Sequence, residues 1–144
     1  NALKYVESEI GKINSEKKRY LDIKYIHRDI TSIIRDKKLK NELEGNDLIY
    51  LSGVYDYLSD KMAARLIQEL FTLLSSKGEL IICNISLEYS SYRAYYELLG
   101  EWSMIHRAKE QMLKWLENIK GANFEFARPS EGDNYHFLII KKVV

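Results

Sequence analysis

The chain has almost none of the residues that build disulfides, cysteine-rich metal sites and rigid turns. Its 144 residues include one cysteine, one proline and three histidines, and the histidines are far apart in the sequence. A single cysteine cannot form an internal disulfide or a cysteine zinc cluster, and the scattered histidines match no metal-ligand spacing. We therefore expect no metal site, and we expect Cys83, which lies in an apolar run, to be a small core residue.

The sequence also lacks a surplus of charge of one sign and any long hydrophobic run. Its 22 basic and 21 acidic residues give a formal net charge of +1. A near-neutral domain has no electrostatic reason to bind nucleic acid or an anionic membrane. No apolar run approaches the roughly 20 residues that a membrane helix needs, and no signal-peptide pattern opens the chain. These absences predict a cytoplasmic protein with neither nucleic acid nor membrane as a partner.

What is present is a composition typical of a folded domain, with 46% hydrophobic and 30% charged residues. The length predicts one domain over residues 1–144. Helical and strand patterns alternate along the chain, and the turn sequence PSEGD joins the last two strands into an antiparallel hairpin. The predicted strands are residues 22–28, 48–51, 79–84, 123–128 and 135–142. The predicted helices are residues 2–13, 31–38, 59–77, 89–99 and 112–119.

Residues 47–60, DLIYLSGVYDYLSD, begin as a buried strand and then become polar, aromatic and acidic. The following helix and strand complete a βαβ unit, in which the two strands are parallel. Ligands of open α/β sheets bind beyond the carboxyl ends of such strands. Gly53 permits a tight turn and the close approach of a ligand to the backbone. We predict a ligand-facing turn at Ser52 and Gly53, with a plain connecting turn as the alternative.

The order of these segments resembles the second half of the class I S-adenosylmethionine-dependent methyltransferase fold. That resemblance implies a Rossmann-like, mainly parallel sheet with helices on both faces and a carboxyl-terminal antiparallel hairpin. It spans most of the chain from Tyr25 onward. The stretches SGVYDYLSD, LLSSKGELIICN and EWSMIHR are similar to a bacterial subgroup related to enzymes that form the methyl ester of 3-hydroxypalmitic acid.

The resemblance implies S-adenosylmethionine as the cofactor and assigns residues to it. Asp29 and Ile30 match the position that contacts the adenine ring. Ser52, Gly53 and Val54 match the turn that passes the methionine part of the cofactor. From the residues alone, Asp29 is better explained as a helix-capping residue, and only the resemblance makes the cofactor role comparable.

A second group of residues is predicted to bind the substrate. The resemblance implies this role for Tyr55 and Tyr57, which fall where the family's substrate contacts begin. The simpler interpretation treats most tyrosines as half-buried amphipathic side chains and residues 106–107 as the solvated start of a helix. The sharper one gives Arg107 a bidentate contact with a substrate carboxylate. The predicted substrate-binding residues are Tyr55, Tyr57, Tyr92, Trp102, His106 and Arg107.

The family's first two strands and its GxGxG loop have no counterpart in residues 1–144. The resemblance therefore implies the carboxyl-terminal portion of a methyltransferase domain, inactive by itself, whose intact form methylates a small molecule on a carboxylate or hydroxyl oxygen. A carboxylate is ionised at pH 7 and needs no general base, whereas a hydroxyl would need one, with His106 the first candidate. The alternative is a non-catalytic interaction module that forms a homodimer through an exposed sheet edge.

Overall fold

The chain divides into two compact units, which comprise residues 1–30 and 31–144. The computed structural model describes residues 2–18, 21–88, 93–127 and 134–143. The first unit contains helix α1 (Ala2–Lys17), four residues longer than predicted. Residues 21–29 form neither helix nor strand, so the strand predicted for residues 22–28 is wrong. Extended backbone becomes a strand only through hydrogen bonds to a neighbouring strand, and no described strand pairs with this segment.

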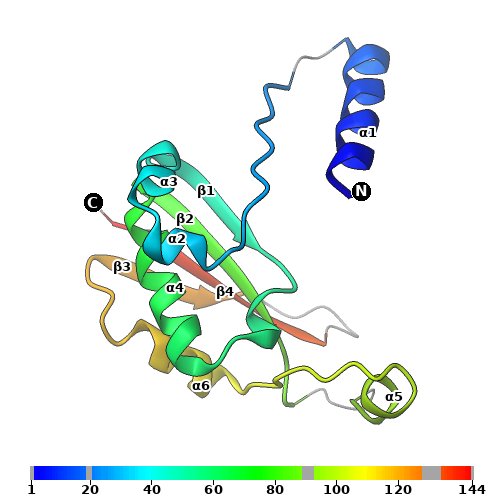
Figure 1. Cartoon of the computed structure of the whole chain (residues 1–144). Coiled ribbons are helices and arrows are strands. Elements are labelled where there is room, and N and C mark those ends of the chain that lie inside the picture. The colour runs from blue at the N-terminus through cyan, green and yellow to red at the C-terminus, as the bar shows by residue number, and fades with distance from the viewer. Residues whose placement is uncertain (1, 19–20, 89–92, 128–133, 144) are drawn as a thin grey trace. The chain divides into compact units, whose positions relative to one another are not determined.

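The second unit is built on a four-stranded sheet with the order β1-β2-β4-β3 (Figure 1). Strands β1 and β2 are parallel, whereas β2 with β4 and β3 with β4 are antiparallel. The predicted hairpin is confirmed, although its turn at residues 129–133 lies outside the described residues. The sheet is therefore mixed and not mainly parallel as predicted, because two of its three strand pairings are antiparallel. The strands are β1 (Asn46–Leu51), β2 (Leu74–Ile85), β3 (Ala122–Phe126) and β4 (Tyr135–Lys142).

Helix α4 (Asp60–Thr72) connects the parallel strands and completes the predicted βαβ unit. Its amino end is capped by the Ser59 side chain, which accepts a hydrogen bond from the backbone amide of Met62. None of the described helices is both long enough and apolar enough to cross a membrane. The remaining helical segments are α2 (Ser32–Arg35), α3 (Lys37–Glu42), the 3₁₀ helix η1 (Tyr55–Tyr57), α5 (Arg93–Leu98), α6 (Lys109–Leu113) and the 3₁₀ helix η3 (Lys114–Leu116).

The core lies between α4 and one face of the sheet. Leu80 and Ile82 of β2 pair with Ile140 and Leu138 of β4, and all four side chains are fully buried. Directly paired residues project from the same face, so these side chains form one apolar layer under the helix. Burial of such side chains contributes about 1.5–3 kcal/mol each. Cys83 is also buried, as predicted for a small core residue.

The outer strand β1 exposes apolar side chains on the opposite face. Leu48 and Tyr50 are both more than half exposed, and the strand pairs on one side only among the described strands. An unpaired strand edge with apolar neighbours can template pairing with another chain. The homodimer given as the alternative stays a prediction.

Candidate ligand-binding rim at the carboxyl ends of β1 and β2

The backbone turns sharply where β1 ends. Ser52 and Gly53 are exposed, and Gly53 has a φ of +67°, a conformation that favours glycine. A Cβ atom placed on Gly53 would meet no heavy atom within 4 Å, so its surface is open to an approaching group. The Ser52 hydroxyl lies 3.5 Å from the Cys83 thiol of β2, and Val54 is half-buried. The predicted tight turn is present and faces solvent.

Tyr55, the next residue, turns inward and does not line the rim. Its side chain is fully buried and stacks on Trp115, with 5.6 Å between the ring centroids. Burial raises the pKa of the Tyr55 hydroxyl, which has no hydrogen-bond partner among the described residues. The substrate contact predicted for Tyr55 does not fit this position, because one turn of η1 points the ring into the core.

Asp56 is buried as well and stabilises the join between the two parallel strand ends. Its carboxylate accepts a 2.6 Å hydrogen bond from the backbone amide of Ile85, at the end of β2. Burial raises the pKa of the Asp56 carboxyl, while the Ile85 amide and the Arg107 guanidinium oppose that rise. The Asp56 carboxylate therefore links the loop after β1 to the end of β2, and it is not exposed to solvent.

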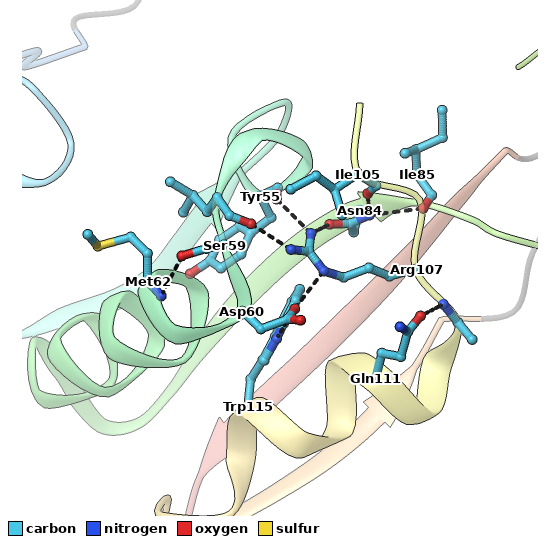
Figure 2. A network of polar contacts seen from close by, with 12 residues as sticks. Tyr55, Ser59, Asp60, Met62, Asn84, Ile85, Ile105, Arg107, Gln111 and Trp115 are labelled. Carbon is cyan, nitrogen blue, oxygen red and sulfur yellow. Dashed lines mark hydrogen bonds and ion pairs between the residues drawn. The ribbon is translucent and has the colours of Figure 1, made fainter. Parts of the chain in front are cut away.

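Arg107 lies at the centre of a buried polar network (Figure 2). Its Nε donates to Asp60 Oδ1 at 2.8 Å. Its Nη1 donates to the Tyr55 carbonyl at 2.9 Å and to Asn84 Oδ1 at 2.7 Å. Its Nη2 donates to the carbonyl of Leu58. One guanidinium thus connects the loop after β1, the start of α4 and the end of β2.

This network leaves Arg107 poorly placed to hold a substrate. Its side chain is 2% exposed, and the guanidinium also lies over the Trp115 ring at 4.9 Å from the centroid. Neither sequence interpretation, a solvated helix start or a substrate clamp, fits that burial. Protein acceptors already take the Arg107 N–H donors that a substrate carboxylate would need, so the predicted substrate contact does not fit this position.

Aromatic side chains gather beside the Gly53 turn. The Trp102 indole N–H donates to the Tyr57 hydroxyl, and the two side chains are 48% and 49% exposed. Tyr96 meets Trp102 edge-on, with ring centroids 5.9 Å apart. The structure therefore brings together two of the predicted substrate residues, Tyr57 and Trp102. Their contact with a ligand stays a prediction, and Tyr92 lies outside the described residues.

Sequence reasoning missed Tyr96 and Tyr135 as members of this region. Tyr135 begins β4 and pairs with Ile85, so the antiparallel register places it at the carboxyl end of β2. Burial, and to a smaller extent the Asp56 carboxyl, raises the pKa of the Tyr135 hydroxyl. The hairpin register was the signal that could have located Tyr135, because an antiparallel strand starts where its neighbour ends.

The remaining predicted site residues are His106, Asp29 and Ile30. His106 is half-buried, and its Nδ1 lies 3.1 Å from the carbonyl oxygen of Met104. Asp29 and Ile30 belong to the first unit. The adenine contacts expected of Asp29 and Ile30 therefore stay predictions.

Comparisons with solved structures show that this fold is shared with methyltransferases. No protein-family model and no curated protein matches the sequence. The S-adenosylmethionine-dependent methyltransferase SibL matches 98% of this chain with a TM-score of 0.66 and 12% identity. The chain has a Rossmann-like fold. Human N-acetylserotonin methyltransferase in complex with SAM matches 89% of it, with a TM-score of 0.59 and 14% identity.

The Rossmann-like fold is shared with an N-methyltransferase as well. NodS from Bradyrhizobium japonicum, in complex with S-adenosyl-L-homocysteine, matches 92% of the chain with a TM-score of 0.51 and 17% identity. The matched part is 40% of SibL, 37% of the human enzyme and 61% of NodS. This chain therefore spans less than two thirds of each of these proteins. The narrower likeness to 3-hydroxypalmitate methyl ester enzymes stays a prediction.

A buried histidine behind the rim makes stability sensitive to pH. His136 of β4 is 4% exposed, and its Nε2 has no hydrogen-bond partner among the described residues. Burial lowers the pKa of His136, while Glu88, whose carboxylate is 3.9 Å from Nε2, and Glu110 raise it and Lys109 lowers it. In the unfolded chain the histidine pKa is about 6.5, so as the pH falls this histidine binds a proton at a higher pH in the unfolded chain than in the folded chain.

We expect the free energy of unfolding to be fully maintained above about pH 6.5 and to fall as the pH drops through the lowered pKa of folded His136. His136→Phe, which keeps a ring against Phe126, should lose less stability between pH 7.5 and 5.0 than the wild type. Urea unfolding at both pH values measures this difference. His27→Phe, at an exposed histidine, is the control. Equal pH sensitivity in all three proteins would contradict the assignment.

Proposed function

We propose that this chain is part of an S-adenosylmethionine-dependent methyltransferase that transfers a methyl group to an oxygen of a small molecule. The observation that supports this is the exposed Ser52-Gly53 turn at the carboxyl end of β1. The turn occurs in a fold shared with methyltransferases, two of which were solved with SAM or S-adenosyl-L-homocysteine.

The residues at the turn fit the cofactor. A ligand can approach the backbone of Gly53, because a side chain is absent and the space above it is open. We assign Ser52, Gly53 and Val54 to the methionine part of S-adenosylmethionine. The bound cofactor would supply an already activated methyl group, so the task of the chain is to orient the acceptor and exclude water.

The acceptor is inferred from the groups that the rim offers. Tyr57 and Trp102 present half-exposed aromatic surfaces beside the turn. The nearby Asp56 and Arg107 are buried and bonded to protein groups, so neither is placed to accept a proton from a substrate. A carboxylate acceptor, which is ionised at pH 7, suits such a site because it needs no general base. A hydroxyl acceptor would depend on His106.

Two glycines at opposite ends of β1 allow a matched test. Gly45 precedes the strand and Gly53 follows it, both have positive φ, and neither would place a Cβ near another atom. Alanine therefore imposes similar backbone strain at both positions. We expect Gly53→Ala to weaken S-adenosyl-L-homocysteine binding about fivefold, close to 1 kcal/mol, and Gly45→Ala to leave it unchanged. Calorimetric titration of the full chain measures both.

Two outcomes would oppose the proposal. One is no detectable binding of S-adenosyl-L-homocysteine by the wild-type chain at millimolar concentration. The other is an equal loss of affinity in Gly45→Ala and Gly53→Ala, which would make the effect one of general destabilisation. Circular dichroism of both variants checks that each remains folded.

A further inference from the structure

A hollow lies between α2 and the amino-terminal turns of α4. Its volume is about 340 Å³, within the range of small-molecule sites. The apolar side chains Ile34 and Met62 line it, and neither is fully buried. None of its described lining residues belongs to the Ser52-Gly53 turn or to the aromatic group of Tyr57, Tyr96 and Trp102. It is therefore a separate feature of the second unit.

Every charged side chain that lines this hollow is a cation. These are Arg35 from α2 and Lys61 and Arg65 from α4. Among the described residues, Lys61 forms no ion pair, and the one side-chain hydrogen bond that Arg35 donates is to the Thr31 hydroxyl, at 3.4 Å. Three cations on one small surface are a local excess in a chain whose formal net charge is +1. A local positive field attracts an anion even when the net charge does not.

The neighbouring carboxylates do not cancel this field. Glu69 pairs with Arg65 at 2.6 Å, but it also pairs with Lys40 at 2.8 Å, so one negative charge serves two cations. The Asp60 carboxylate accepts from Arg107 and from the indole of Trp115. Both of these acids are thus engaged by other cations or donors.

The orientation of α4 adds to the same preference. Ser59, Lys61 and Met62 line the hollow and belong to the start of this 13-residue helix. The positive end of the helix dipole therefore faces the hollow. Ser59 already caps the Met62 amide, so the helix contributes a field and the side chains must supply the direct contacts.

We propose that this hollow, called the α2–α4 groove below, binds a small amphiphilic anion, a carboxylate attached to a medium-length apolar body. The carboxylate would pair with Arg35, Lys61 or Arg65. The apolar body would lie on Ile34, Met62 and the aliphatic stems of the basic side chains, which pack against apolar groups while their charged ends stay in water. A groove of this volume can hold one such molecule and is too small to be a binding surface for a macromolecule.

Titration of the full chain with decanoate, followed by amide chemical shifts, tests the proposal. Decanoate should shift amides of α2 and of the first two turns of α4. Decanol, which lacks the charge, and acetate, which lacks the apolar body, should each bind several-fold more weakly. Lys61→Gln and Arg65→Gln should each weaken decanoate binding about two- to fivefold, as expected for exposed ionic contacts. Lys120→Gln, at an exposed lysine elsewhere, should not change it.

Met62→Gln tests the apolar half of the groove. This change keeps the length of the side chain and should weaken decanoate binding while leaving the fold intact, since Met62 is exposed. Equal affinity for decanol and decanoate, or shifts confined to other parts of the chain, would overturn the proposal. Displacement of decanoate by S-adenosyl-L-homocysteine would also overturn it, because the groove would then belong to the cofactor site.

A vesicle experiment separates a free carboxylate from a lipid surface. Binding to anionic phosphatidylglycerol vesicles without binding to free decanoate would overturn the small-ligand proposal in favour of a membrane contact. Binding of free decanoate with the Lys61 and Arg65 dependence described above would support it. Neither result depends on whether the chain binds S-adenosyl-L-homocysteine, so this proposal and the proposed function can fail separately.

Discussion

Arg107→Met is expected to lower the free energy of unfolding by about 2–5 kcal/mol, because two buried acceptors lose their donor. The change removes the guanidinium, and it leaves the buried Tyr55 carbonyl and Asn84 Oδ1 without this donor. The Asp60 carboxylate and the Leu58 carbonyl lose the same partner at less buried positions. A buried polar group that loses its partner costs far more than the partnership contributes when it is intact. Urea unfolding measured by circular dichroism gives the difference.

Arg93 provides the matched control, because its Nε pairs with the Glu97 carboxylate at the same 2.8 Å distance. The Arg93 side chain is 48% exposed, whereas that of Arg107 is 2% exposed. Arg93→Met should therefore cost no more than about 0.5 kcal/mol. Similar losses in the two variants would contradict the buried-network interpretation. Arg107→Lys should recover only part of the stability, since an ammonium cannot reproduce the planar fork.

Tyr55→Ala should cost about 3–5 kcal/mol, the range for removing a large buried aromatic side chain. The ring is fully buried and stacks on Trp115, so its loss leaves a cavity beside α4. Tyr55→Phe should be neutral or stabilising by up to about 1 kcal/mol, because the buried hydroxyl has no partner among the described residues. Thermal and urea unfolding of both variants measure these opposite effects.

The same pair of variants distinguishes a core residue from a ligand contact. Tyr57→Ala is the control on the rim, where the side chain is half exposed, and it should change stability by less than about 0.5 kcal/mol. If Tyr55→Ala left stability unchanged while weakening ligand binding, the corrected placement of Tyr55 would be wrong. A stability loss in Tyr55→Phe as large as that in Tyr55→Ala would show a hydrogen bond that the structure does not contain.

The parts of the fold that local pattern could predict are those whose signals lie within one short segment. The apolar run of β1, the Ser59 cap and the apolar spacing of α4 predicted the βαβ unit, which the parallel pairing of β1 and β2 confirms. Gly53 was predicted to form a turn because its position after a buried strand and its lack of a side chain are both readable in the sequence. A helix cap, a hydrophobic spacing and a glycine turn each depend on residues that are close together in the sequence.

Only the tertiary structure decided which side chains turn inward. The partners of Arg107 are 23 to 52 residues away in the sequence, and nothing in the residues around it indicates that its charge is buried. Residues 22–28 have a strand-like pattern, yet a strand also requires a neighbour to bond, and pattern does not supply one. The sequence thus determined local elements and the turn at Gly53, whereas long-range packing determined the burial of Tyr55 and Arg107, because burial depends on contacts between distant segments.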